Sequence, residues 1–284
     1  MTATVSQATS CRQTWTALNW LLVTALATLL PHVARAEMRD ISALVAEAGV
    51  DPETSTMVVV RLSDGRHWIS NVGRATTRFI PASTSKIPHT LIALEIGVVD
   101  TDTIIEWDGK RRWLDSWNKD QTLPSAYRNS AVWAYQHFAR QIGHQTMAAW
   151  ITRFDYGNHD IGSDENLTTY WLRGPLEISA SEQIDFLSKL AEQSLPLSNQ
   201  TYAKALEIMM ADNGADWTLY AKTGWHYDET GMDIGWYVGW VDRAGDRYAF
   251  ALNMDMPSSD YVRLRVSTVR FVLDALDIAP AAGG

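Results

Sequence analysis

The chain has 284 residues, 46% of them hydrophobic, and a formal net charge of −9. This length suffices for one large domain or two closely packed lobes, and the negative charge argues against nucleic acid or an anionic membrane as a partner. The single cysteine, Cys11, excludes an intramolecular disulfide framework.

The first 36 residues have the composition of a secretion signal. They contain no Asp or Glu, Arg12 precedes an apolar run over residues 18–30, and Ala34-Arg35-Ala36 offers small residues to a signal peptidase. An uncleaved membrane anchor is the alternative, which the short and interrupted run disfavours. The sequence therefore predicts cleavage after Ala36, export to the periplasm, and a more acidic mature chain.

The segment that follows predicts a short helix and a hairpin. Residues 41–48 have helical spacing and end at Gly49, and β-branched strands at 57–62 and 67–72 flank Asp64-Gly65. A helix with a buried side is predicted from about residue 83 to Gly97. Its first turn should be distorted, because Pro88 lacks the N–H that a regular helix needs there.

Helices dominate the middle of the chain, and strands return near its end. Helical patterns cover 130–142, 146–154, 179–194 and 201–211, strand patterns cover 217–221, 234–241 and 247–254, and a helix covers 262–276. This order predicts an α+β fold: an antiparallel sheet of about five strands flanked by terminal helices, with an inserted, mostly helical lobe. Residues 37–284 are expected to form a single domain, with the sheet lobe at about 37–80 and 200–284 and the helical lobe at about 81–199.

Ser83 and Lys86 are the first candidate site residues. They lie three residues apart, so a helix brings both to one face, near an N-terminus that favours developing negative charge. A deprotonated Lys86 could activate the Ser83 hydroxyl as a nucleophile. The spacing alone is weak, because Ser116 and Lys119 repeat it.

Two later stretches strengthen the interpretation of Ser83 and Lys86 as site residues. Ser130 is either a helix N-cap or a second hydroxyl that relays a proton. Lys222-Thr223-Gly224 comes at the end of a predicted strand, where glycine permits close approach by a ligand. Ser-x-x-Lys, a later serine and Lys-Thr-Gly together form the signature of serine β-lactamases and penicillin-binding proteins.

The whole chain from about residue 58 to 276 resembles the class D serine β-lactamases, the oxacillinase type. The motifs that carry this resemblance are Pro-Ala-Ser-Thr-x-Lys-Ile-Pro (81–88), Ser130-x-Val132, Tyr-Gly-Asn (156–158), the stretch 170–180, Lys-Thr-Gly (222–224), the stretch 235–241, and Asn-Met-Asp-Met-Pro (253–257).

The resemblance implies a role for each matching residue. Ser83 attacks the β-lactam carbonyl and forms an acyl-enzyme, the backbone N–H groups of Ser83 and Trp225 form the oxyanion hole, and Ser130 passes a proton to the departing nitrogen with Lys222 beside it. Val132, Thr223, Gly224 and an arginine of the last helix bind substrate. Arg265 matches the family position better than Arg263.

The resemblance also implies that Lys86 carries a carbamate formed from carbon dioxide, which acts as the general base. Trp171 and Val132 match the residues that support it. No other cofactor and no metal are expected. The chain departs from the family at Ser85, where phenylalanine is common, and at Trp133, where proline is common.

These observations predict hydrolysis of penicillin-type antibiotics and antibiotic resistance. The alternatives are a penicillin-binding D,D-peptidase and a penicillin-sensing domain that does not turn over. β-Lactams are the expected partners, with no nucleic acid, no membrane after signal cleavage, and a monomer or homodimer. No Gly-x-Ser-x-Gly and no His-Glu-x-x-His occurs, which disfavours an α/β-hydrolase and a zinc hydrolase.

Overall fold

The computed structural model describes residues 1–2, 4, 38–229 and 231–281. The predicted secretion signal and its cleavage site lie outside the described residues. Contacts divide the chain into Met1–Arg35 and Ala36–Gly284, and the fold belongs to the second unit. None of the helices in the described ranges combines the length and the apolar character that crossing a membrane requires.

The strands form one sheet in the order β1-β3-β2-β7-β6-β5-β4. Their bounds are β1 (Met38–Asp40), β2 (Ser55–Arg61), β3 (His67–Ile69), β4 (Met210–Asn213), β5 (Trp217–His226), β6 (Asp233–Arg243) and β7 (Asp246–Met256). The predicted hairpin is present, with Val59 opposite Trp68 in β2 and β3. All neighbours are antiparallel except β1 and β3, which are parallel.

The α+β class is confirmed, but the strand count and the purely antiparallel sheet were wrong. The sheet has seven strands where about five were expected. Both additional strands lie at the edges, β1 with three residues and β4 with four. Their residues are exposed or nearly so, and therefore they lack the alternation of buried and exposed side chains that marks a strand in a sequence.

Ten α-helices and three short 3₁₀ turns are found within the described ranges. They are α1 (Ser42–Glu47), α2 (Val72–Ala75), η1 (Ala82–Ser85), α3 (Lys86–Glu95), η2 (Asp115–Trp117), α4 (Leu123–Arg128), α5 (Val132–Ile142), α6 (His144–Arg153), η3 (Asp164–Asn166), α7 (Tyr170–Arg173), α8 (Ala180–Ala191), α9 (Asn199–Met209) and α10 (Tyr261–Ala275). The distorted turn that Pro88 predicts is present as η1, which leads directly into α3.

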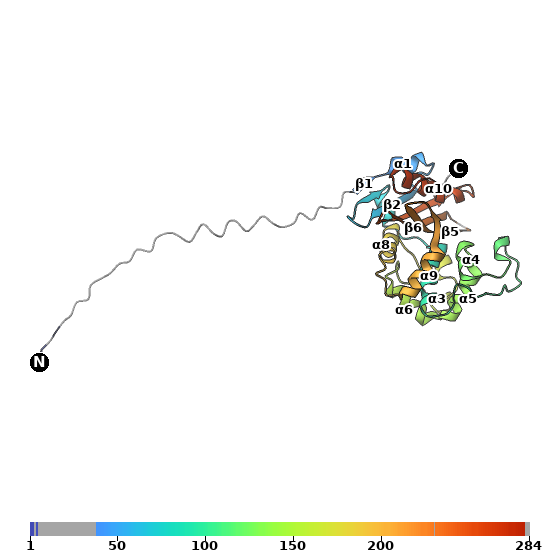
Figure 1. Ribbon diagram of the computed structural model, residues 1–284, viewed down its shortest axis with the longest axis horizontal. Coiled ribbons are helices and arrows are strands. Elements are labelled where there is room, and N and C mark those ends of the chain that lie inside the picture. The colour runs from blue at the N-terminus through green and yellow to red at the C-terminus, as the bar shows by residue number, and fades with distance from the viewer. Residues whose placement is uncertain (3, 5–37, 230, 282–284) are drawn as a thin grey trace. The chain divides into compact units, whose positions relative to one another are not determined.

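The sheet separates two apolar cores. One face packs against α1 and α10, where Val59 and Phe250 meet Val45 and Val269. The other face packs against α8 and joins the core of the helical region, which contains α3, α5 and α6. Figure 1 shows α3, α4, α5, α6 and α9 gathered on the side of the sheet away from α1 and α10. The first residues of α3 therefore stand where sheet and helical region meet.

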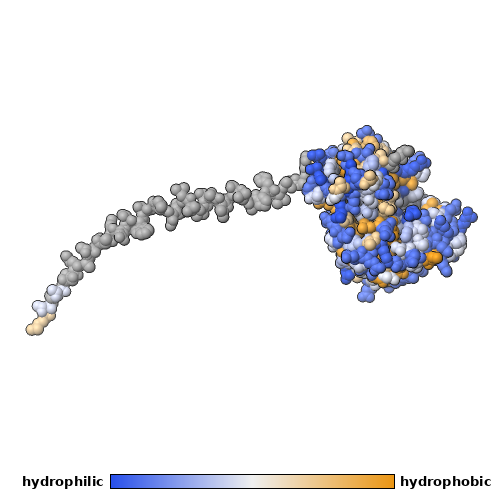
Figure 2. Space-filling view, viewed as in Figure 1, coloured by the Kyte–Doolittle hydropathy of each residue, from blue (hydrophilic) through white to orange (hydrophobic). Residues whose placement is uncertain are grey.

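The visible surface of the folded unit is mostly hydrophilic. Figure 2 shows hydrophilic residues over most of the visible face of the folded unit, with smaller apolar patches between them. Large exposed apolar side chains include Trp113 and Tyr227, which are 72% and 66% exposed. With Trp225 they line a hollow of about 390 Å³.

Candidate active site

The turn η1 and the start of α3 bring the Ser83 hydroxyl to the Lys86 amine. Lys86 Nζ lies 2.9 Å from Ser83 Oγ, and the lysine is fully buried. Burial disfavours the ammonium form and lowers the pKa of Lys86 well below its usual range, and the charge of Lys222 adds to this. A buried amine with a lowered pKa beside a half-buried hydroxyl is an arrangement suited to a nucleophile and its base.

The second Ser-x-x-Lys pair is not assembled in this way. Ser116 lies in η2, Lys119 is exposed beyond it, and no hydrogen bond joins their side chains within the described ranges. Lys119 therefore keeps the solvation that Lys86 has lost. The fold distinguishes two pairs that were equivalent by spacing.

Lys222 on β5 meets Ser130, which precedes α5. Lys222 Nζ lies 2.5 Å from Ser130 Oγ and 5.5 Å from the centre of the Tyr127 ring. Burial, aided by the charge of Arg265, lowers the pKa of Lys222 to about 7. Ser130 has a φ of +53° and is not a helix cap, because Ala131 takes the N-cap position. The hydroxyl is thus left to face a lysine.

The lowered pKa of Lys222 predicts a pH-dependent stability. The unfolded chain has a normal lysine and binds more protons between pH 7 and about 10.4, so the free energy of unfolding rises with pH over that window. In Lys222→Met this contribution disappears. Urea unfolding should show that the free energy of unfolding increases more from pH 7 to pH 9.5 in the wild type than in the variant. Equal increases in the two proteins would contradict the lowered pKa of Lys222.

The sequence suggested that the Lys-Thr-Gly motif lies at the end of a strand, but the motif lies inside β5. The strand continues to His226 because β6 pairs with it over its whole length. Gly224 faces η1: a Cβ there would lie 3.0 Å from the carbonyl oxygen of Pro81 and from Thr84 Cγ2. Because Gly224 has no side chain, β5 can approach the turn that carries Ser83. Trp225 is the next residue of the same strand.

Arg265 reaches the same strand from α10. Its Nη1 donates to the Gly224 carbonyl and its Nε to the Val262 carbonyl at 3.0 Å. Gly235 leaves the room for it, since a Cβ there would lie 2.9 Å from Arg265 Cδ. Burial lowers the pKa of Arg265 to about 10, and within the described ranges no carboxylate pairs with it. Arg263 is exposed, so of the two arginines it is Arg265 that the fold places against β5.

The remaining predicted residues lie on η1, α5 and α7. Val132 is half-buried as the first residue of α5, and Trp171 in α7 is fully buried. Ser85 donates to the Ala82 carbonyl at 2.7 Å, so this departure from the family adds no unpaired hydroxyl. Trp133 donates to the Trp117 carbonyl at 2.9 Å and so ties η2 to α5.

The structure also gives a role to Tyr156-Gly157-Asn158, which sequence reasoning left without chemistry. Gln183 donates to Thr84 Oγ1 at 3.0 Å and to the Tyr156 hydroxyl at 3.3 Å, which anchors the residue next to the nucleophile. Asn158 donates to the Pro175 carbonyl at 2.9 Å. A Cβ on Gly157, whose φ is +61°, would clash with the Glu177 carbonyl oxygen at 2.2 Å. The Tyr156-Gly157-Asn158 motif therefore fixes neighbouring segments of the chain, among them the loop that contains Pro175 and Glu177.

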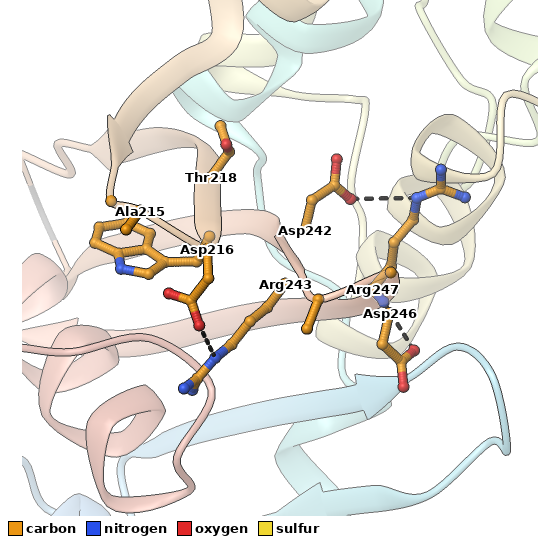
Figure 3. A pocket seen from close by; sticks show the side chains of 11 residues that line it. Ala215, Asp216, Thr218, Asp242, Arg243, Asp246 and Arg247 are labelled. Carbon is orange, nitrogen blue, oxygen red and sulfur yellow. Dashed lines mark hydrogen bonds and ion pairs between the residues drawn. The ribbon is translucent and has the colours of Figure 1, made fainter.

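A second polar hollow lies elsewhere, at the turn between β6 and β7. It has a volume of about 440 Å³. Figure 3 shows its charged side chains paired with one another: Arg243 with Asp216, and Arg247 with Asp242 at 3.2 Å. No buried nucleophile lines it. The chemistry is therefore sought at Ser83.

Known proteins match this chain over most of its length. A family model described as "Penicillin binding protein transpeptidase domain" matches residues 37–271. Beta-lactamase OXA-48 of Klebsiella pneumoniae is 42% identical over 214 residues, which cover 75% of this chain and 80% of that protein. Beta-lactamase OXA-2 of Salmonella typhimurium is 40% identical over 229 residues, which cover 79% and 81%.

Solved structures of similar proteins share the fold. The class D β-lactamase YbXI from Nostoc has a TM-score of 0.80 and 35% identity, and the match covers 84% of this chain and 99% of that one. The class D β-lactamase FUS-1 (OXA-85) from Fusobacterium nucleatum subsp. polymorphum has a TM-score of 0.78 and 35% identity, with 83% and 96% covered.

Proposed function

The chain belongs to the class D β-lactamases, and we propose that it hydrolyses penicillin-type antibiotics through an acyl-enzyme on Ser83, with carbamylated Lys86 as the general base. The observation that carries the proposal is the 2.9 Å contact between the Ser83 hydroxyl and the buried amine of Lys86, whose pKa is lowered. In this proposal the Ser83 oxygen forms a bond to the lactam carbonyl carbon, and the ring C–N bond breaks.

The surroundings of Lys86 fit a carbamate. The neutral amine is the form that adds carbon dioxide, with loss of one proton, and the group so formed supplies a general base. Trp171 Nε1 is a buried donor without a hydrogen-bond partner among the described residues, and such a donor is costly unless an acceptor reaches it. Trp171 and the apolar wall at Val132 are the residues that would hold the group.

Ser130 and Lys222 support the opening of the lactam ring, which completes the first step of the proposed reaction. The 2.5 Å contact aligns a hydroxyl with a lysine whose pKa is about 7, a value suited to moving a proton at neutral pH. In this proposal Ser130 protonates the ring nitrogen as it leaves. Backbone N–H groups of Ser83 and Trp225 stabilise the oxyanion, a contribution of about 10²–10³ in rate for each donor.

Hydrolysis of a chromogenic cephalosporin by the purified protein, with and without added bicarbonate, tests the proposed function. We expect repeated turnover that increases with bicarbonate. A single burst of acylation without turnover would instead favour the penicillin-sensing domain or the D,D-peptidase. If the rate of turnover in buffers freed of carbon dioxide does not depend on added bicarbonate, the carbamate is contradicted. The proposed acyl-enzyme on Ser83 would still stand.

Arg265 and Thr223 are proposed to bind the substrate carboxylate. Replacing Arg265 by glutamine should lower kcat/KM for benzylpenicillin about 10–100-fold, mainly by raising KM, since a charge-assisted hydrogen bond is worth about 1.5–3 kcal/mol. Steady-state kinetics check this. Arg263→Gln is the matched control, because Arg263 is exposed two residues earlier in α10. Equal losses in the two variants would contradict the assignment.

Export to the periplasm and antibiotic resistance complete the proposal. The composition of residues 1–36 supports a cleaved signal. Intact-mass measurement of the exported protein should show a chain beginning at Glu37, and cells that express it should grow at higher penicillin concentrations. Expression of Ser83→Ala should give no such protection.

A further inference from the structure

His89 follows Lys86 by one turn of α3 and is only 1% exposed. Its imidazole contacts both of the first residues of α7. The ring lies perpendicular to the Trp171 ring with 4.6 Å between centroids, and Nε2 shares a hydrogen bond with the Tyr170 hydroxyl. The proposed reaction assigns no role to this buried, polar side chain.

The orientation of Trp171 depends on such neighbours. Its indole N–H is buried and has no hydrogen-bond partner within the described ranges, so no bond of its own fixes the ring. The helix that carries it has four residues, too few to be rigid without tertiary contacts. Tyr170 packs edge-on against Trp171 at 4.9 Å, and His89 binds both.

The same imidazole is linked to the surroundings of Lys86. His89 stacks with Tyr135 at 6.2 Å between centroids, and the Tyr135 ring lies 5.0 Å from Lys86 Nζ. Burial and the charge of Lys86 lower the pKa of His89 to about 3, so the ring is neutral at physiological pH. It therefore adds no positive charge beside a lysine that must lose its own.

We propose that His89 is a positioning residue for the reaction: through the Tyr170 hydroxyl and the face of Trp171, it holds the indole N–H where the carbamate on Lys86 needs a donor. This inference rests on the proposed function of Lys86. His89 touches neither substrate nor a reacting atom in this role. Residues that orient a direct ligand in this way are worth about 10–100-fold in affinity at metal sites.

Titration with ¹³C-labelled bicarbonate, followed by the carbamate signal in ¹³C NMR, measures the occupancy of Lys86 directly. In His89→Leu, the bicarbonate concentration for half occupancy should rise about tenfold, and high bicarbonate should restore hydrolysis. Tyr170→Phe removes only the hydroxyl and should shift the titration in the same direction by a smaller factor. It also keeps the test open if His89→Leu does not fold.

Leu91→Ala is the matched control, since Leu91 is a fully buried apolar residue of the same helix. It should lower the melting temperature and leave the bicarbonate titration unchanged. If His89→Leu and Tyr170→Phe titrate like the wild type, His89 is only a core residue and the inference is overturned. If the wild type itself shows no carbamate signal, the proposed base fails and this inference falls with it.

Discussion

Replacing Ser83 by alanine is expected to abolish β-lactam hydrolysis, with a loss of about 10⁶ in kcat as for other enzymes that lose a nucleophile. The Ser83 oxygen is the atom proposed to form the covalent bond, and it lies 2.9 Å from Lys86 Nζ. Intact-mass spectrometry after incubation with penicillin should detect the acyl-enzyme in the wild type and no adduct in the variant.

Ser116→Ala is the matched control for this experiment. Ser116 belongs to the second Ser-x-x-Lys pair, but its hydroxyl lies outside the buried cluster. The control should keep wild-type turnover and the same adduct mass. Residual hydrolysis by Ser83→Ala at more than about 1% of the wild-type rate would show that another group attacks the ring, and the assignment of the nucleophile would then be wrong.

Replacing Lys86 by alanine should lower turnover about 10⁴-fold, the upper range for general acid–base catalysis. Both steps of the proposed reaction, attack by Ser83 and attack by water, need a base in the same place. Any acyl-enzyme that forms should therefore persist, and mass spectrometry after mixing should find it long after the wild type has released its product. Added bicarbonate should not accelerate the variant.

Lys119→Ala supplies the control, because Lys119 has the same spacing from a serine but is exposed. It should match the wild type in rate and in response to bicarbonate. Normal deacylation by Lys86→Ala would overturn the role of Lys86 as base. A melting curve of each variant separates these outcomes from misfolding, which would lower both acylation and the melting temperature.

Several features could be predicted before the fold was known. Local patterns predicted the hairpin at Asp64-Gly65, the first half of β5, most of β6 and β7, and the terminal helix α10, because each buries residues at its own period. The α+β class followed from their order. The set of short motifs around Ser83, Ser130 and Lys222 was specific enough to indicate the family and therefore the reaction.

Other features arise only when distant segments meet. The edge strands β1 and β4 exist because a neighbour offers hydrogen bonds, and their exposed residues carry no period. Burial, which Ser-x-x-Lys spacing does not encode, separates Lys86 from the exposed Lys119. The contact of His89 with Tyr170 joins residues 81 positions apart. The motifs alone indicated Lys86 as the base, but desolvation and long-range contacts are properties of the packed chain, and so the burial of Lys86 and its contacts were decided only by the tertiary structure.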